Sequence, residues 1–480
     1  MNKLTVDVAV IGTGTAGLSA YRAARAQGKH TLLIESGPYG TTCARVGCMP
    51  SKLLIAASEA AHMVHAAAGF GVHAGQVRID GQEVMGRVRR ERDRFVGFVL
   101  ESVDNIPDQD KLRGHARFTG PHSLQVDEHT VVEAARVVIA TGSRPYLPAE
   151  LRDVGPGVIV SDQVFDWTDL PESVAVIGTG VIGLELGQAL HRLGVRVALF
   201  ARGGSVAQIS DPEVLHAAAK VLCAELDLRF QQKVMAAKQD GGEVLLTTRD
   251  GAGAERSERF QYVLVAAGRT PNVDNIGIET TGLELDARGI PVFDPLTMQC
   301  GTSPIFIAGD ANNERPLLPE AADHGKIAGD NAGRYPGVHP GLRRTPLAIA
   351  FTEPQVATLG ASYRELCTAG RHTFAVGKVS FENQGRSRVM LQNQGVLRVY
   401  GEYGSGVFLG AEMIGPRAEH LSHTLAWACQ ARMTVAQMLD MPFYHPVIEE
   451  GVRTALRDLA AELEKNAPAE SDAPDCTPGV

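Results

Sequence analysis

An apolar run followed at once by a glycine-rich turn and a helical stretch occurs twice in this chain, and no other feature constrains its fold as much. The two runs are residues 7–11 and 173–177. A strand that enters such a turn presents the backbone N–H groups of the following helix, which bind a pyrophosphate. Second runs at 31–34 and 196–200 complete two β-α-β units. The turn glycines are Gly12, Gly14 and Gly17 in the first unit, and Gly178, Gly180 and Gly183 in the second.

The two units differ where their second strand ends. Glu35 closes the first unit roughly 20 residues after its turn, the spacing at which a carboxylate accepts hydrogen bonds from an adenosine ribose. We therefore expect an adenine dinucleotide there; the alternative is a glycine-rich turn that only packs. The second unit ends in Ala201 and Arg202, with no acid. A guanidinium suits a ribose 2′-phosphate, which favours NADP(H), and the alternative is a solvated surface arginine.

Length, charge and cysteine content bound the class of protein. At roughly 150 residues per domain, a chain of 480 residues holds about three domains. The 46 Lys and Arg against 55 Asp and Glu give a net charge of −9, so nucleic acid is not an expected partner. We expect no membrane segment and a cytoplasmic location. Seven cysteines are too few for a disulfide framework, so a close pair is expected to be redox-active.

Such a pair lies between the two units, at Cys43 and Cys48. On a regular helix, cysteines five residues apart are too distant for an unstrained bridge, so a disulfide needs an irregular turn, which Gly47 makes easier. A disulfide in distorted geometry near a helix start is more reducible, and the helix N-terminus favours the resulting thiolate. The alternative is two buried structural thiols.

The rest of the chain alternates between helical and strand patterns. Residues 54–104 read as helical, and residues 112–140 as short strands and turns. Past residue 345 strands alternate and are followed by helices near 419–432 and 447–464. Residues 466–480, which include Cys476, are rich in Pro, Ala and acid and are expected to be a disordered tail.

These motifs together resemble the class I flavin-dependent pyridine nucleotide-disulfide oxidoreductases, and within them the dihydrolipoamide dehydrogenases. The resemblance covers about residues 5–462. Besides the two glycine turns, it rests on Cys43-x4-Cys48-Met-Pro-Ser-Lys52, Ala140-Thr141-Gly142-Ser143-Arg144-Pro145, Gly268-Arg269-Thr270-Pro271-Asn272, Ile307-Ala308-Gly309-Asp310 and Phe443-Tyr444-His445-Pro446-Val447-Ile448-Glu449-Glu450.

The resemblance implies a role for each motif residue. Cys48 would be the thiol nearer the flavin, and Cys43 the thiol that exchanges with the substrate. Lys52 would lie near the flavin N5 and pair with Glu185, and Asp310 would hold the ribityl chain. The remaining cofactor-binding residues would be Gly12, Gly14, Gly17, Glu35, Thr141 and Gly142 for FAD, and Gly178, Gly180, Gly183, Arg202 and Gly268 at the nicotinamide side. No metal ligands are implied.

His445 and Glu450 resemble the family's acid/base histidine and its orienting carboxylate, which act in the other subunit of a homodimer. An imidazole is suited to moving a thiol proton near neutral pH. Pro446 favours a helix start at this point, which would leave Glu450 one turn further in.

The resemblance thus implies an α/β protein with two Rossmann-like dinucleotide-binding domains, for FAD and for NAD or NADP, and a C-terminal α+β dimerisation domain. The expected boundaries are 1–150 with 275–345 for FAD, 151–274 for NAD(P), and 346–465 for dimerisation. The expected reaction moves electrons between a small dithiol/disulfide, most readily dihydrolipoamide/lipoamide, and NAD(P). Lipoyl domains of a 2-oxoacid dehydrogenase complex are a further expected partner.

Two departures from the family pattern keep alternatives open. Ala44-Arg45 stands where an apolar residue and an asparagine are more usual, and Ala201 replaces the acid of NAD-selective members. A related flavin reductase acting on another small disulfide, a metal ion or a quinone would share the electron path. A non-catalytic subunit that docks to a partner complex is the other alternative.

Overall fold

The computed structural model describes residues 2–465 and divides into two compact units. Unit 1 comprises Met1–Pro50, Arg87–Tyr146 and Arg269–Arg344. Unit 2 comprises Ser51–Gly86, Leu147–Gly268 and the described part of Thr345–Val480. The predicted disordered tail, with Cys476, lies outside the described residues.

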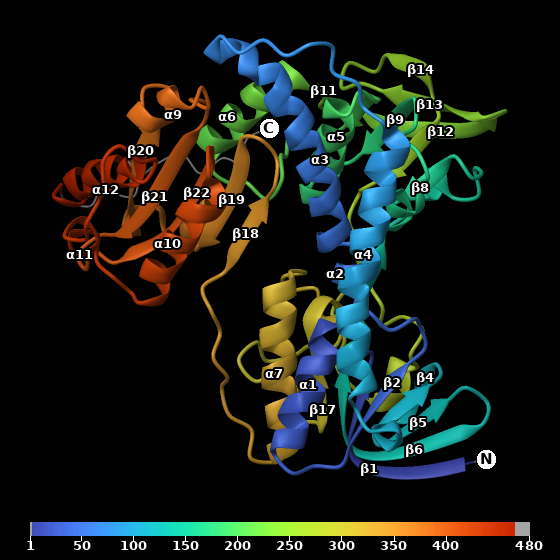
Figure 1. The fold of residues 1–480 in the computed structure, drawn as a ribbon. Coiled ribbons are helices and arrows are strands. Elements are labelled where there is room, and N and C mark those ends of the chain that lie inside the picture. The colour runs from blue at the N-terminus through green and yellow to red at the C-terminus, as the bar shows by residue number, and fades with distance from the viewer. Residues whose placement is uncertain (1, 466–480) are drawn as a thin grey trace. The chain divides into compact units, whose positions relative to one another are not determined.

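Unit 1 is built on a mainly parallel sheet extended by an antiparallel hairpin (Figure 1). The strand order is β3-β2-β1-β6-β5-β4, and β17 pairs with β6. Strands β1, β2, β3, β6 and β17 run parallel, so their carboxyl ends meet at one edge. The strands are β1 (Asn2–Ile11), β2 (Thr31–Glu35), β3 (Lys111–Arg113), β4 (Ala116–Gly120), β5 (Ser123–Val126), β6 (Thr130–Ile139) and β17 (Ile305–Ile307).

Helices α1 (Thr15–Ala26) and α7 (Leu318–Arg334) lie side by side in unit 1, as Figure 1 shows. Small residues allow their backbones to approach closely. A Cβ added at Gly325 would lie 2.1 Å from the Ala16 carbonyl oxygen, and one at Gly329 would lie 2.2 Å from that of Ala20. The two helices therefore form one rigid layer directly behind the glycine-rich turn. A short ladder of β7 (Ser143–Pro145) and β16 (Arg269–Pro271) closes this unit.

Unit 2 contains the second parallel sheet, in the order β11-β10-β9-β15-β8, with α5 (Val181–Arg192) and α6 (Pro212–Glu225). An antiparallel sheet of β12, β13 and β14 follows along the chain. The strands are β8 (Val158–Val160), β9 (Ser173–Ile177), β10 (Arg196–Phe200), β11 (Asp227–Arg229), β12 (Lys233–Asp240), β13 (Glu243–Arg249), β14 (Glu255–Phe260) and β15 (Tyr262–Val265).

The C-terminal part of unit 2 is an antiparallel sheet, in the order β18-β19-β22-β21-β20, packed with helices. Leu397, Met413 and Leu456 are among its fully buried residues. The strands are β18 (Leu347–Ala350), β19 (Gln355–Gly360), β20 (Phe374–Ser380), β21 (Val396–Glu402) and β22 (Phe408–Gly415). The helices are α8 (Tyr363–Ala369), α9 (Gly385–Val389), α10 (Ala418–Gln430), α11 (Val435–Leu439) and α12 (Glu450–Leu463). The α/β class with a C-terminal α+β part is therefore confirmed.

The prediction of a continuous helical region at 54–104 is wrong in its middle. Helix α3 (Cys48–Ala66) and a single 3-10 turn (Ala67–Phe70) end at Gly71, and residues 72–80 have no regular structure before α4 (Gly81–Asp104). Gly71 has a left-handed backbone with φ of +78°, which ends the turn. The sequence between them, from Val72 to Asp80, lacks the periodicity of an amphipathic helix.

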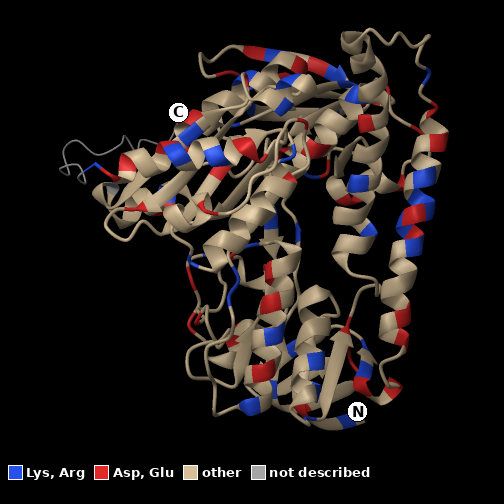
Figure 2. Ribbon diagram, turned by 60° about the vertical axis from the view of Figure 1, so that its left-hand side comes forward, with Lys and Arg blue, Asp and Glu red and all other residues tan. Residues whose placement is uncertain are grey.

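One stretch among the described residues, 42–70, is long and apolar enough to cross a membrane by length and composition alone. It carries the cysteine motif, and core helices of globular proteins pass the same test, so this is weak support for a membrane span. Figure 2 shows basic and acidic residues interspersed along both units.

Candidate functional site

The first glycine-rich turn joins β1 to α1 and leaves room for a ligand at one point. Gly12 has φ of +105°, and a Cβ there would lie 2.4 Å from the Ala140 carbonyl oxygen. At Gly17 a Cβ would lie 1.9 Å from the Gly12 carbonyl oxygen, so both positions require glycine. A Cβ at Gly14 would instead meet nothing within 4 Å. Gly14 caps α1 without a side-chain hydrogen bond, and the first turn carries no acid, so its N–H groups can receive a pyrophosphate.

Glu35 is held beside this turn at the end of β2. Its Oε2 accepts hydrogen bonds from the N–H and the hydroxyl of Thr13, both at 2.8 Å, and its Oε1 accepts one from the Gly37 N–H at 2.7 Å. A carboxylate has about four acceptor positions, so capacity remains for ribose hydroxyls. The carboxylate and the turn are thus fixed as one unit, as an adenine dinucleotide site requires.

Thr141, Gly142 and Asp310 meet at the same sheet edge, because β6 and β17 are parallel neighbours. Oδ2 of Asp310 accepts a hydrogen bond from the Ser143 hydroxyl at 2.7 Å. Asn272 donates from its backbone to the Gly142 carbonyl and from its amide to that of Thr141, at 2.9 and 3.0 Å. The buried Thr141 hydroxyl has no partner among the described residues. An orphaned hydroxyl facing this edge fits a polar cofactor.

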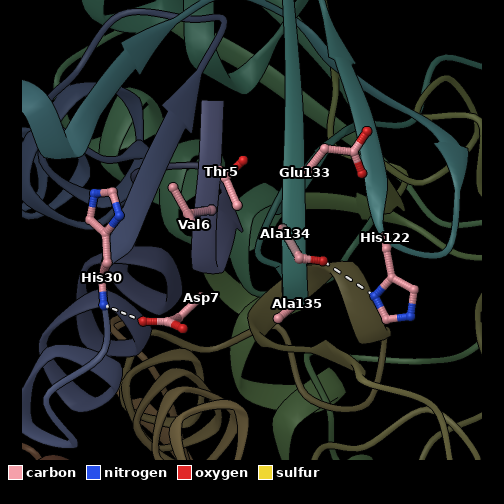
Figure 3. A pocket seen from close by; sticks show the side chains of 8 residues that line it. All are labelled: Thr5, Val6, Asp7, His30, His122, Glu133, Ala134 and Ala135. Carbon is pink, nitrogen blue, oxygen red and sulfur yellow. Dashed lines mark hydrogen bonds between the residues drawn. The ribbon is translucent and has the colours of Figure 1, made fainter. Parts of the chain in front are cut away.

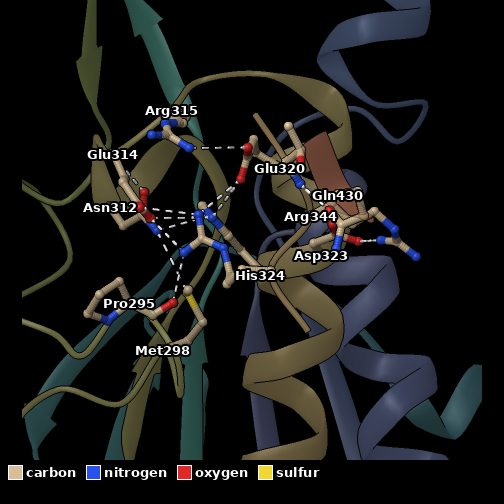
Figure 4. A network of polar contacts seen from close by, with 12 residues as sticks. Pro295, Met298, Asn312, Glu314, Arg315, Glu320, Asp323, His324, Arg344 and Gln430 are labelled. Carbon is tan, nitrogen blue, oxygen red and sulfur yellow. Dashed lines mark hydrogen bonds and ion pairs between the residues drawn. The ribbon is translucent and has the colours of Figure 1, made fainter. Parts of the chain in front are cut away.

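A buried polar network supports the turn that carries Asp310 (Figure 4). Asn312 donates to Nδ1 of His324 at 3.1 Å, and Nε2 of His324 lies 3.4 Å from carboxylate oxygens of both Glu314 and Glu320. Arg343 pairs with both acids, at 3.1 and 3.0 Å. Burial and this network act in opposite directions on the pKa of Glu320, which ends below its usual value. Sequence reasoning missed the network, since its members come from separate motifs.

The cysteine motif has the irregular turn that the spacing predicts. A short helix α2 (Thr42–Val46) ends at Gly47, and α3 begins at Cys48. A Cβ at Gly47 would lie 3.2 Å from the Cα of Cys43, so the chain folds back onto Cys43 at this point. Cys43 is partly buried and Cys48 is exposed. Cys48 is therefore the first residue of α3, at a helix N-terminus, where a thiolate is favoured.

Lys52 lies one turn beyond Cys48 on α3 and pairs with Glu185 of α5. Nζ of Lys52 lies 2.7 Å from Oε2 of Glu185, whose Oε1 accepts a hydrogen bond from the Phe351 N–H at 2.9 Å. The ammonium also lies 4.7 Å from the Phe351 ring centre. Glu185 is 3% exposed, so its carboxylate is buried and needs the partners that Lys52 and Phe351 supply. The predicted pair is therefore formed, and it fixes the direction of the lysine.

The second glycine-rich turn repeats the geometry of the first. A Cβ at Gly178 would lie 2.4 Å from the Ala266 carbonyl oxygen, and one at Gly183 would lie 2.1 Å from that of Gly178. A Cβ at Gly180 would meet nothing within 4 Å, and the same holds at Gly268. Gly180 caps α5 without a side-chain hydrogen bond. Arg202 is exposed in the loop that leaves β10, while Ala201 before it is buried.

His445 and Glu450 form a side-chain pair on the surface of unit 2. Nδ1 of His445 lies 2.9 Å from Oε1 of Glu450, and the histidine side chain is 80% exposed. The hydrogen bonds from His445 and from the Val447 N–H lower the pKa of Glu450. An ionised carboxylate only accepts, so Nδ1 carries the proton and Nε2 faces outward. The prediction that a helix starts at Pro446 is wrong: α12 starts at Glu450, because residues 445–449 form a turn.

A pocket of about 400 Å³ in unit 1 has none of the motif residues in its lining. It is lined by the early part of β1 and by His30, His122 and Glu133. Figure 3 shows the two histidines on opposite sides of it. Over residues 2–465, three or more His, Cys, Asp or Glu side chains are nowhere grouped to hold a metal ion.

Comparison with known proteins matches two family models. Residues 6–325 match the pyridine nucleotide-disulphide oxidoreductases, and residues 347–456 match the dimerisation domain of the same enzymes. The chain is 31% identical to a dihydrolipoyl dehydrogenase of Thermus scotoductus, over 96% of this chain and 98% of that protein. It is also 31% identical to a mercuric reductase of Acidithiobacillus ferrooxidans, over 96% and 84%.

Among solved structures, the HOCl-induced flavoprotein disulfide reductase RclA from Escherichia coli superposes with a TM-score of 0.78. The alignment covers 95% of this chain and 99% of that one, at 21% identity. At that identity the likeness concerns the fold alone.

Proposed function

Because the chain belongs to the pyridine nucleotide-disulphide oxidoreductase family, we propose that it moves electrons between a dithiol/disulfide substrate and a nicotinamide nucleotide, with dihydrolipoamide and lipoamide as the substrate pair. The family uses FAD and NAD(P). The observation that carries the proposal is the helix break at Gly47, which separates the short helix that contains Cys43 from the helix that begins at Cys48.

The chemistry that we propose for this chain is thiol–disulfide exchange. In the reducing direction, the Cys43 thiolate attacks one sulfur of the substrate disulfide, whose S–S bond breaks as a mixed disulfide forms. Cys48 then attacks the Cys43 sulfur, which releases the second substrate thiol and leaves a Cys43–Cys48 disulfide. Two electrons have then moved from the cysteine pair to the substrate, and dithiol oxidation is the reverse. When bound, FAD and the nicotinamide nucleotide supply or accept these two electrons.

We propose that the proton in this exchange is handled by His445 of the partner subunit in a homodimer. Nδ1 is committed to Glu450, so Nε2 is the atom that accepts the thiol proton and returns it to the leaving thiolate. His445 and Tyr444 are both 80% exposed, so in one chain the acid/base group points away from its own core. The dimerisation domain supports this arrangement.

The proposed cofactor sites follow the two glycine turns. Residues 1–150 with 275–345 would bind FAD, through the first turn, Glu35 and the Thr141–Asp310 edge. Residues 151–274 would bind the nicotinamide nucleotide, and 346–465 would form the dimer interface. Arg202 would pair with the 2′-phosphate of NADP(H), since the loop after β10 offers it an exposed guanidinium and no acid. A cytoplasmic location and binding to lipoyl domains remain predictions.

A second candidate substrate class is another small disulfide, a metal ion or a quinone reduced with NAD(P)H. It is favoured by Arg45, which packs beside Gly40 in the cysteine segment: a Cβ at Gly40 would lie 3.0 Å from Cδ of Arg45. A guanidinium in the segment that carries the thiols adds a positive charge where the family pattern has none. A mercuric reductase is also as similar to this chain as a dihydrolipoyl dehydrogenase is.

The deciding experiment is steady-state oxidation of dihydrolipoamide by the FAD-loaded protein, with NAD⁺ and NADP⁺ compared side by side. Rapid turnover supports the lipoamide proposal. If turnover is negligible while NADH or NADPH still bleaches the flavin, the electron path serves another acceptor. The reductase assay is then repeated with glutathione disulfide, Hg²⁺ and a quinone in turn.

A further inference from the structure

The loop from β10 to α6, residues 201–211, carries Arg202 and is fixed at three points. Its start is tied to β11, because the Ala201 N–H donates to the Arg229 carbonyl at 2.8 Å. Its middle is tied to the second glycine turn, where the Thr179 hydroxyl donates to the Ser205 carbonyl at 2.7 Å. The third point is the end of the loop, just before α6.

That end is held by Glu412, a residue of the C-terminal sheet. Oε2 of Glu412 accepts hydrogen bonds from the backbone N–H groups of Ser210 and Asp211, at 2.7 and 2.9 Å. Oε1 accepts from the Ser210 hydroxyl at 2.5 Å and from the Tyr363 N–H at 2.9 Å. Three of the four donors therefore belong to the last two residues of the loop.

Glu412 is fully buried in β22, where the residues opposite it on the neighbouring strands are Arg398 of β21 and Thr358 of β19. A buried carboxylate is expensive unless donors surround it, and here all four acceptor positions are used. The loop thus gains a fixed end that ordinary core packing would not supply.

A neighbouring cluster secures the start of α6 through the side chain of Asp211. Asp211 caps α6 by accepting from the Glu213 and Val214 N–H groups, and its Oδ2 accepts from the Tyr400 hydroxyl at 3.0 Å. Arg398 forms an ion pair with Asp211 at 2.8 Å. Tyr400 touches the helix cap and leaves the N–H groups held by Glu412 untouched, so it offers a matched control.

We propose that Glu412 is a positioning residue for nucleotide selectivity: by holding residues 210–211, it sets the loop in the conformation in which Arg202 meets a ribose 2′-phosphate. This inference rests on the proposed role of Arg202. Only a nucleotide with a 2′-phosphate can make that contact. Substitution of Glu412 should therefore weaken the binding of NADP and leave the binding of NAD unchanged.

The test uses Glu412→Gln in the FAD-loaded protein, with Kd for NADP⁺, NAD⁺ and 2′,5′-ADP measured by calorimetry. Glu412→Gln removes the charge from the hydrogen bonds to Ser210 and Asp211, and its N–H₂ group leaves either these two backbone N–H groups or that of Tyr363 without an acceptor. We expect Kd for NADP⁺ and 2′,5′-ADP to rise about tenfold, the effect of one charge-assisted hydrogen bond. Kd for NAD⁺ should change by less than about twofold, and Tyr400→Phe should leave the ratio of the two Kd values unchanged.

The outcomes separate this inference from the function on which it rests. If Arg202→Ala does not weaken NADP⁺ binding, the proposed role of Arg202 is wrong. If Arg202→Ala weakens NADP⁺ binding and Glu412→Gln does not, the positioning role of Glu412 is overturned. The same holds if Glu412→Gln weakens the binding of NAD⁺ as much as that of NADP⁺. In the Arg202→Ala background, Glu412→Gln should have no further effect on NADP⁺.

Ser210→Ala removes only the hydroxyl donor to Glu412. It is the variant to measure if Glu412→Gln does not fold. It should raise Kd for NADP⁺ about two- to threefold and leave Kd for NAD⁺ unchanged. This effect is smaller than the loss of a whole hydrogen bond to a charged group. An unchanged ratio of the two Kd values in this variant would also overturn the proposal.

Discussion

Gly180→Ala should uncouple nicotinamide binding from folding and from FAD binding. A Cβ at position 180 meets no atom within 4 Å, and the backbone there, with φ of −70° and ψ of 178°, is one that alanine adopts readily. The substitution therefore costs the folded protein little. The methyl group does, however, occupy the open space in front of the N–H groups that begin α5, where a pyrophosphate would sit.

The size of the effect follows from the contact that the methyl group blocks. Loss of one hydrogen bond to a charged group is worth about 1.5–3 kcal/mol, which is roughly a 10- to 150-fold rise in Kd for the nicotinamide nucleotide. The assay is calorimetric binding of NAD⁺ and NADP⁺ to purified protein, with FAD content read from the visible flavin absorbance. FAD content and thermal unfolding should match the wild type.

Two matched variants sharpen the test. Gly14→Ala places a methyl group in the corresponding space of the first turn, so FAD should be lost while the fold survives. Gly183→Ala brings a Cβ to 2.1 Å from the Gly178 carbonyl oxygen, so it should destabilise the protein as well. An unchanged nucleotide Kd in Gly180→Ala, or loss of FAD from it, would refute the assignment of the two turns.

Three further predictions concern the thiols and the histidine pair. Cys43→Ser and Cys48→Ser should each abolish turnover with a disulfide while FAD stays bound, and substantial dithiol oxidation by either variant in a steady-state assay would contradict their roles. Glu450→Gln should lower kcat roughly 10²-fold without changing FAD content. In the wild type the pKa of Glu450 is lowered, so its contact with His445 should persist below the pH at which a glutamate usually takes up a proton. The contact should be lost only as the pH falls through that lowered pKa, which a pH–rate profile checks. Burial raises the pKa of Cys300 to about 12, so iodoacetamide should label Cys300 at pH 8 only after denaturation. The stability that the neutral thiol contributes should be lost as the pH rises from about 9 towards 12. Detection of labelled Cys300 by mass spectrometry in protein that was never denatured would contradict this.

The glycine turns and the cysteine pair could be predicted because each is a local pattern with a fixed spacing. The pairing of Lys52 with Glu185, 133 positions apart in the chain, is implied only by the family resemblance. Glu35 is an example: its distance along the chain from the turn is set by one helix and one strand, so sequence alone places it. The structure adds what spacing does not contain, such as the two hydrogen bonds from Thr13 that hold the carboxylate.

The network around His324 could not be predicted in this way. Its members come from a turn, a helix and the segment after that helix, and each looks like an ordinary surface polar residue in the sequence. Only the packing of α7 against α1, which depends on Gly325 and Gly329, buries the histidine among the two acids. Sequence reasoning also ended the loop before α12 too soon, because a proline suits the first turn of a helix but does not require one.

Glu412 lies between these two cases. A single acid inside the apolar run of β22, residues 408–415, is a local signal that a charge is buried there. Such a charge needs several donors, so the sequence could have predicted a network but not its location. The structure supplies the location, at the end of the loop that carries Arg202. A residue more than 200 positions away in the chain would thus bear on nucleotide choice, because the side chain of Glu412 on β22 holds the end of the loop between β10 and α6.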